Sequence, residues 1–522
     1  MIWKIAKKEF LLNLMTFKFA VGTILCVVLV SVFVPILAKE HQQRLEEYNE
    51  NVTANEAEIR KVMVYKNILP TVYRPPNVLS VFSEGAEKRL GTSAKISHLD
   101  VPEISATSNE VNPYMSMFPA LDVSLILRVV FSVLALLLAY NVVSGEREQG
   151  TLKLILSGEI SRHQVLLGKL LAGLMTLLVP VTIVFIIGLL LLMSFPMIEL
   201  TTSDWAGIGL MYVASLTFIS AMYTLGLLFS TLTKKSAISL VLGLFAWVIF
   251  AVVVPSGSIY LATQLRPLES QEKLEAQREM TIQEYRAKEL EVSEKFPHWR
   301  GPKSDAGGAF GQGYTVVCAR SCLDDASKAY PLLKSIESNY GDSIWRIELH
   351  YIRSLLRQNH LARNIARISP ISVYENVMST LAQSDLGSLQ GFIDNARAYR
   401  NEITEYISSK TDNFSSYSYF TICKKEDAME YQKRTEPFLE SMKSENKSDR
   451  ERARDDFDKW KNSIMAQHSP LDLQDFPRFS YQPAIVKSLK RAIPDLMLLV
   501  FVNVFLFALS FAAFVRYDVR SD

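Results

Sequence analysis

Three of the four cysteines lie in one polar region, and they are the residues best suited to covalent chemistry. They are Cys318, Cys322 and Cys423, whereas Cys26 lies in an apolar run. Three cysteines allow one disulfide, and a bridge from Cys423 to either of the others requires that this region lie outside the cytosol. Three unpaired buried thiols are an equal alternative. The Cys318–Cys322 spacing has no second cysteine or histidine pair, which argues against zinc.

Other residues that could hold a metal or a nucleotide are poorly placed for it. Met115 and Met117 offer thioethers that suit Cu(I), but methionines beside a membrane helix more often serve in packing. No run ends in Gly-Lys-Ser/Thr, as a phosphate-binding loop requires, and Gly301-Pro302-Lys303-Ser304 lacks the upstream glycine. We therefore predict no metal, no cofactor and no catalytic residues on this chain.

Apolar residues gather in long runs that could cross a membrane. A spanning helix needs about 20 mostly apolar residues, and a run this long is too long for a cleaved signal sequence. Six segments qualify, namely residues 17–37, 121–143, 165–193, 207–231, 237–262 and 494–515. The sequence therefore predicts an α-helical polytopic membrane protein with six transmembrane helices.

Lysine and arginine in the short loops predict the orientation. Basic residues occur in segments 1–16, 144–164 and 516–522 and between the fourth and fifth spans, whereas the loop between the third and fourth spans has none. Cytoplasmic loops carry such an excess, so both termini are predicted to be cytoplasmic. Segments 38–120 and 263–493 then lie outside, and the second is expected to be a mostly helical extracytoplasmic domain. The net charge of +2 gives no reason to expect nucleic acid as a partner.

Two features near the membrane boundaries have open interpretations. In segment 1–16, Trp3, Ala6, Phe10 and Leu14 recur at helical spacing, which predicts either an interfacial amphipathic helix or an extension of the first span. In the second span, Arg128 is the best candidate for a functional charge inside the membrane. The alternative is that its long side chain reaches toward the outer interface.

The loop of residues 144–164 is the most informative stretch. Gly150 can end the second helix, and Thr151 can cap a short helix that presents Leu152, Ile155 and Leu156 on one face. An exposed apolar face in the cytosol requires something to cover it. A soluble subunit could dock there and move both adjoining spans, or the helix could lie on the inner leaflet, and the pattern does not favour either.

The same loop resembles the signature of ABC-2 type transporter permeases. The resemblance rests on Glu146, Glu148, Gly150, Thr151, Leu152, Leu156, Ser157, Ile160, Ser161, Arg162, Gly168 and Lys169. Glu159 departs from the proline common in that family. Residues 230–236, with Trp247 and Pro255, resemble the region of that family between the fourth and fifth spans. The stretch from Ser369 to Arg400 and the tail from Phe514 to Arg520 resemble a subgroup, the multicopper-enzyme maturation permeases.

The resemblance implies a coupling helix that docks on a separate ATPase. Its expected residues are Glu146, Glu148, Gly150, Thr151, Leu152, Ile155, Leu156, Ser161 and Arg162. It also implies two permease chains, identical or homologous, and two ATPase chains that bind ATP and Mg. We therefore expect a permease in a bacterial inner or plasma membrane that exports an unidentified substrate, with lipid and an extracytoplasmic protein as further partners. The alternatives are ATP-driven mechanical work through the outer domain, or an assembly factor without an ATPase.

Overall fold

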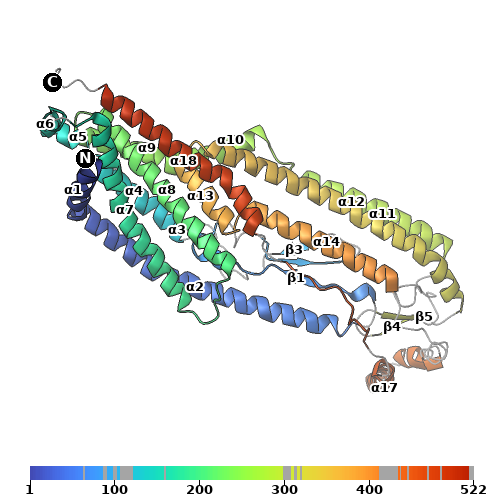
Figure 1. The fold of residues 1–522 in the computed structure, drawn as a ribbon. Coiled ribbons are helices and arrows are strands. Elements are labelled where there is room, and N and C mark those ends of the chain that lie inside the picture. The colour runs from blue at the N-terminus through green and yellow to red at the C-terminus, as the bar shows by residue number, and fades with distance from the viewer. Residues whose placement is uncertain are drawn as a thin grey trace.

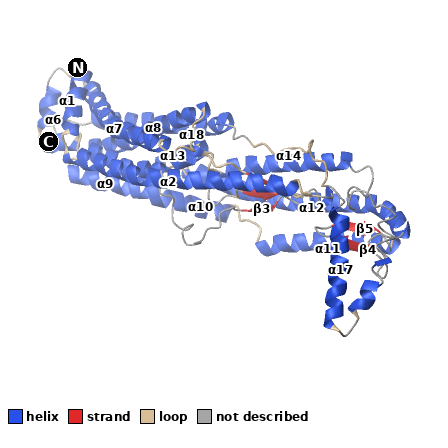
Figure 2. Cartoon of the chain, turned by 90° about the horizontal axis from the view of Figure 1, so that it is seen from below, coloured by secondary structure: helices blue, strands red, loops and turns tan. Residues whose placement is uncertain are grey.

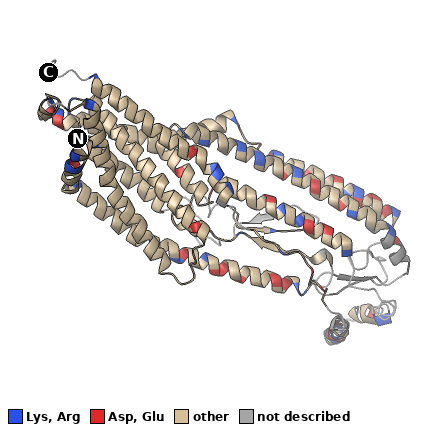
Figure 3. Cartoon of the chain, viewed as in Figure 1, with Lys and Arg blue, Asp and Glu red and all other residues tan. Residues whose placement is uncertain are grey.

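The structure is a computed structural model, and it describes most of the chain. The described residues are 1–62, 65–85, 91–97, 103–105, 122–157, 160–297, 307–310, 314–317, 320–410, 433–434, 437–443, 446–466, 470–481 and 485–516. Within them the fold is almost entirely helical and elongated, with an apolar bundle at one end and a polar domain at the other (Figures 1 and 2). Lys, Arg, Asp and Glu concentrate in the polar domain and at the opposite tip of the bundle (Figure 3).

Six helices in the described part of the chain are long and apolar enough to cross a membrane, which confirms the predicted fold class. They are α2 (Phe17–Ile59), the second span Val123–Glu148, α7 (Arg162–Met193), α8 (Thr202–Leu232), the fifth span Ser236–Leu265, and Val486–Val515 within α18 (Ile485–Val515). The second span comprises α3 (Val123–Ile126), the π-helical turn η5 (Leu127–Phe131), α4 (Ser132–Ala139) and α5 (Ser144–Glu148). The fifth comprises α9 (Ser236–Val248), the π-helical turn η6 (Ile249–Val253) and α10 (Val254–Leu265).

Helix α8 forms the centre of the bundle and packs against α4, α7 and α18. Small residues allow the close approach, as is usual between helices in membranes. A Cβ added at Gly226 would lie 2.7 Å from the Cβ of Ala139, and one at Gly173 would overlap the buried ring of Tyr223. The fifth span packs far less closely, and most of its apolar side chains are exposed.

The polar domain combines both of the long segments between spans. Helix α2 continues well past residue 37, where the first span was predicted to end, and enters this domain. A three-stranded antiparallel sheet of β1 (Thr71–Tyr73), β2 (Ser93–Lys95) and β3 (Glu103–Ser105) pairs in the order β1-β2-β3. Buried residues of the first segment, such as Ile68 and Ile96, pack against Phe392 and Ile403 of α14 (Leu386–Lys410). The two segments therefore share one hydrophobic core.

Beyond that core, the second segment forms long helices. Helix α11 (Gln271–Lys295) packs along α12 (Arg320–Ala366), and the hairpin of β4 (Gly307–Phe310) and β5 (Tyr314–Val317) lies between them in the sequence. Helix α1 (Ile2–Leu14) packs on α7 at the opposite end of the molecule. Helix α17 (Lys447–Ala466) runs across the direction of the other long helices (Figure 2).

The whole of residues 263–493 was predicted to lie outside the membrane. In the structure, one helix of this segment lies among the spans instead. This is α13 (Pro370–Leu381), which packs against α8 and α18. The ring of Tyr374 stacks on Phe218 with a 4.4 Å centroid separation, and Ser369 Oγ donates a hydrogen bond of 2.7 Å to the carbonyl of Phe250. Phe218 and Phe250 lie near the midpoints of α8 and the fifth span. Helix α12 therefore brings the chain from the polar domain to the middle of the bundle, and α13 leads it back toward that domain.

Candidate functional site

The 144–164 loop forms two short helices at the end of the bundle that also carries α1 and the end of α18 (Figure 1). Helix α5 ends in a turn at Gly150, whose φ of +75° favours glycine, and α6 (Thr151–Ser157) follows directly. Thr151 was predicted to cap α6. It is instead the first helical residue, and its Oγ1 donates 3.3 Å to the carbonyl of Glu146.

Glu146 belongs to an ion cluster that connects three elements. Lys169 of α7 has a side chain only 2% exposed, and its Nζ lies 2.7 Å from Glu146 Oε1 and 3.4 Å from Glu9 Oε1 of α1. A buried ammonium requires such carboxylate partners, because leaving it unpaired in the bundle would cost several kcal/mol. Glu146 therefore connects α5 to α7, and the shared partner Lys169 also connects both helices to Glu9 of α1.

The next two charged residues of α5 bind the neighbouring spans. Arg147 donates from its guanidinium to the carbonyls of Thr233 at 2.9 Å and Thr231 at 3.3 Å, at the C-terminal end of α8. Glu148 accepts from the backbone N–H and hydroxyl of Ser236, at the first residue of α9. A cation at a helix C-terminus and an anion at a helix N-terminus both agree with the helix dipole. Helix α5 therefore connects the end of α8 to the start of α9.

The apolar residues of α6 differ in orientation from the prediction. Leu152 is fully buried against Val143, Val165 and Phe514, and Ile155 packs on the same cluster. The exposed apolar side chain is Leu154, at 74%, on a face that also presents Thr151 and Ser157. The side chain of Leu156 lies outside the described residues. The bundle itself therefore covers part of the face that was predicted to need a partner. The prediction did not include Leu154, the apolar side chain of α6 that is exposed.

The far end of the loop is joined to the last span. Ser161 precedes α7, and its hydroxyl lies 3.3 Å from His163 Nε2. Arg162 donates from its guanidinium to the carbonyl of Val515, near the C-terminus of α18. Together with the contacts of α5, these bonds connect the loop to α1, α7, α8, α9 and α18.

The local sequence does not reveal the distant partners of Lys169 and Arg162 at this loop. Glu9 and Val515 are far from the loop in the sequence, and no local pattern pairs them with Lys169 or Arg162. The one available signal for Leu154 was its three-residue spacing from both Thr151 and Ser157, which places these residues on one helix face. Gly158, Glu159 and the tail from residue 517 lie outside the described residues.

No group of three or more His, Cys, Asp or Glu side chains that could hold a metal occurs among the described residues. Cys26 is buried and unpaired. The 115–117 methionine motif and Cys423 lie outside the described part of the chain, as do the side chains of Cys318 and Cys322.

A family model described as "ABC-2 family transporter protein" matches residues 3–519. The match covers nearly the whole chain, including all six candidate spans. No curated protein gives a match.

Proposed function

Because the chain belongs to the ABC-2 family of transporter proteins, we propose that it is the permease through which a separate ATPase subunit drives export of a substrate. The 144–164 loop is the site at which the ATPase acts. This site supports the proposal because one short segment makes hydrogen bonds or ion pairs to α7, α8, α9 and α18, and its partner Lys169 on α7 also pairs with Glu9 of α1.

In the proposed topology, both termini and the 144–164 loop face the cytoplasm of a bacterial cell. The N-terminus, α5, α6 and the end of α18 lie together at one end of the bundle (Figure 1). Lys4, Lys7 and Lys8 on α1 add positive charge at that end, as expected for a cytoplasmic face. The polar domain, including the part of α2 beyond the bundle, is then extracytoplasmic.

The ATPase would contact the exposed face of α6, which presents Thr151, Leu154 and Ser157. A helix can dock by placing its exposed apolar side chain in a groove of a partner protein, and Leu154 supplies that side chain here. ATP and Mg would bind to that partner, since no phosphate-binding loop occurs in these 522 residues. Leu152 and Ile155 would act indirectly, by holding α6 on the bundle through their contacts with Phe514 and its neighbours.

A second permease chain, identical or homologous, would complete the transporter. The fifth span offers a surface for it, because most of this span's side chains are exposed. Exposed apolar residues along α9 and α10, such as Phe245, Val252 and Tyr260, would contact either this second chain or lipid.

Substitution of Leu154 tests the docking face directly. Leu154→Asp should abolish co-purification of the ATPase and its stimulated ATP hydrolysis, because a charge would be buried at the contact. Thermal unfolding should be unchanged, since this side chain is 74% exposed. Met15→Asp, at an 85% exposed residue on the same end of the molecule, is the matched control. Normal ATPase stimulation by Leu154→Asp would contradict the proposed contact.

A mechanical role for the polar domain is the second candidate function. It is favoured by the contacts of α18, which bonds to both the loop and the polar domain. One end of α18 accepts a hydrogen bond from Arg162 of the loop. Near its other end, Asp495 accepts a 2.6 Å bond from Arg367, which follows α12 of the polar domain. Motion of the loop could pass along α18 to that domain. Substrate flux in proteoliposomes separates the candidates, because a purely mechanical complex would hydrolyse ATP without flux.

A further inference from the structure

The half of α12 that approaches the bundle is strongly basic. Residues 349–374, which run from α12 into α13, contain no Asp or Glu, whereas four arginines lie among them, namely Arg353, Arg357, Arg363 and Arg367. The outer part of the α11–α12 pair carries charges of both signs (Figure 3). A segment as long as residues 263–493 needs no such excess to set the orientation of the chain, because the bias toward positive cytoplasmic loops concerns short loops. The basic stretch therefore requires another explanation.

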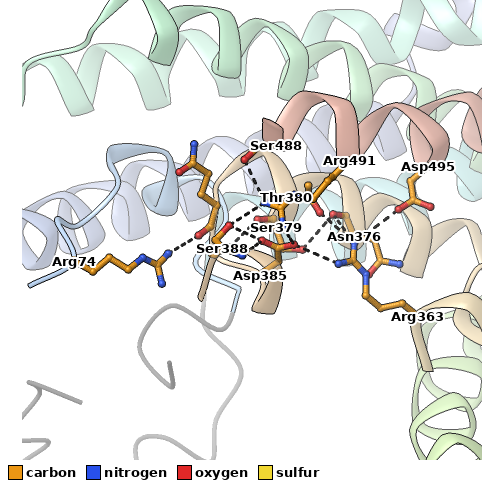
Figure 4. Close-up of polar contacts among 12 residues, drawn as sticks. Arg74, Arg363, Asn376, Ser379, Thr380, Asp385, Ser388, Ser488, Arg491 and Asp495 are labelled. Atoms are coloured by element: carbon orange, nitrogen blue, oxygen red, sulfur yellow. Dashed lines mark hydrogen bonds and ion pairs between the residues drawn. The ribbon is translucent and has the colours of Figure 1, made fainter. Parts of the chain in front are cut away.

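Two of these arginines hold α12 beside the start of α18. Arg367 Nε lies 2.6 Å from Asp495 Oδ1 of α18. Arg363 and Arg491 of α18 lie 3.5 and 3.2 Å from the same oxygen of Asp385, which directly precedes α14 (Figure 4). Both helices run from the polar domain toward the bundle (Figure 1). The shared carboxylate therefore places Arg363 level with Arg491.

This level corresponds to the membrane boundary next to the polar domain. A helix rises about 1.5 Å per residue, so Arg491 lies about 36 Å along α18 from Val515 at its other end. A bilayer is about 30 Å thick in its hydrocarbon core and about 40–45 Å thick with its headgroups. Arg491 and the residues level with it therefore lie at the depth of lipid headgroups.

Three further basic residues within about two helical turns of this level have no carboxylate partner among the described residues. They are Arg357 on α12 and Lys487 and Lys490 on α18, and all three are exposed. On α12, α18 and the turn before α14, six basic side chains at headgroup depth thus face two carboxylates, Asp385 and Asp495. This surface has an excess of positive charge that the chain itself does not neutralise.

Exposed apolar side chains continue from these basic residues toward the interior of the membrane. On α18, Lys490, Met497 and Phe501 recur at helical spacing, so they share one exposed face. On α12, the exposed Ile368 lies about three turns beyond Arg357 on the same face. Each helix therefore presents positive charge at headgroup depth and an apolar surface directly below it.

We propose that the ends of α12 and α18 next to the polar domain bind a phospholipid whose headgroup has a net negative charge. Arg357, Lys487 and Lys490 would contact the phosphate, and the acyl chains would lie along Met497 and Phe501. Basic clusters beside membrane helices commonly recognise anionic headgroups. A soluble anion or an acidic protein would use the charges without the apolar surface. The proposal rests on the membrane location of the bundle and does not require ATPase docking.

Native mass spectrometry of the full chain, purified in a polyoxyethylene detergent, provides the test. The probes are phosphatidylglycerol and phosphatidylethanolamine with the same acyl chains, of which only the first has a net charge. We expect phosphatidylglycerol to bind at least tenfold more tightly. The Arg357→Gln/Lys490→Gln double variant should weaken its binding roughly twentyfold, because each basic residue near an anionic headgroup strengthens binding about fivefold. Arg357→Lys/Lys490→Arg keeps both charges and should bind phosphatidylglycerol as the wild type does.

Arg286→Gln/Lys288→Gln is the matched control, because it removes the same charge from two exposed side chains of α11 that also have no carboxylate partner among the described residues. Its phosphatidylglycerol binding should equal that of the wild type. Equal binding of both lipids, an equal loss in this control, or wild-type affinity in Arg357→Gln/Lys490→Gln would overturn the proposal. A delipidated dimer that retains no phosphatidylglycerol would also overturn it, by showing that a second copy of the chain covers this surface.

Discussion

Lys169 and Glu146 form a nearly buried ion pair at 2.7 Å that joins α7 to the start of the 144–164 loop. Glu9 of α1 completes the cluster at 3.4 Å from the same ammonium. A force applied to α5 would therefore reach α7 and α1 through the Lys169 side chain. The cluster differs from an exposed salt bridge, which contributes little, because burial removes the competition from water.

Replacing Lys169 tests whether this cluster couples the loop to the bundle. Lys169→Met should lower the free energy of unfolding by roughly 1–3 kcal/mol, since two carboxylates would lose their cation. It should also reduce ATPase stimulation, and Lys169→Arg should preserve most of both. The measurements are thermal unfolding and ATP hydrolysis by the assembled complex. A Lys169→Met/Glu146→Gln double variant more stable than the single Lys169→Met variant would demonstrate the interaction, whereas wild-type stability in Lys169→Met would exclude it.

The close contact between α7 and α8 predicts a second effect. Gly173→Ala would place a methyl group against the fully buried ring of Tyr223, so we expect a loss of about 1–3 kcal/mol in the free energy of unfolding. Gly209→Ala in α8 is the matched control, because an added Cβ there has no neighbour within 4 Å among the described residues. Thermal unfolding in one detergent measures both. Equal unfolding temperatures for the two variants would show that the helices separate easily at this point.

The polar domain should show an acid-sensitive contribution from Asp475. Its carboxylate lies 2.6 Å from Lys410 Nζ, and the hydrogen bond from Lys410 lowers the pKa of Asp475. A carboxyl with a lowered folded-state pKa stabilises the fold above its unfolded pKa of about 3.9, and this stabilisation is lost as the pH falls through the folded value. The difference in unfolding temperature between wild type and Asp475→Asn should therefore be small at pH 7 and should decrease as the pH falls below about 3.9.

Salt provides the control for the Asp475 prediction. Both side chains are partly exposed, so 1 M NaCl at pH 7 should reduce the same difference by screening the pair. Lys410→Met should resemble Asp475→Asn at pH 7. A difference that stays constant from pH 7 to pH 3 would mean that Asp475 acts through packing or through its bond from Tyr406.

Much of the fold follows from local sequence. The spans are predictable because an apolar run must be about 20 residues long to cross a bilayer, and hydropathy measures that property directly. The long α11 and α14 helices agree with charged and amphipathic patterns that the sequence displays within each segment. The short α6 helix is foreseeable for the same reason, since Gly150 breaks the chain and an apolar spacing follows.

The orientation of α6 is not a local property. The pattern of Leu152, Leu154 and Ile155 contains two apolar faces, and what decides between them is the presence of Phe514 from the end of the chain beside Leu152. Likewise, the sequence around Arg128 does not predict its ion pair with Glu375 of α13. Contacts between residues this far apart depend on how whole helices pack.

The sequence by itself determined the helical class, the number of spans and the location of the informative loop, because hydrophobic burial and helix length act within one segment. The tertiary structure decided that α13 descends among the spans, that Ser372 and Asn376 line a cavity, and that Leu154 rather than Leu152 is exposed. These features depend on which distant surfaces exclude water from one another. A hydropathy pattern records that a side chain favours burial, but it does not record which neighbour provides it.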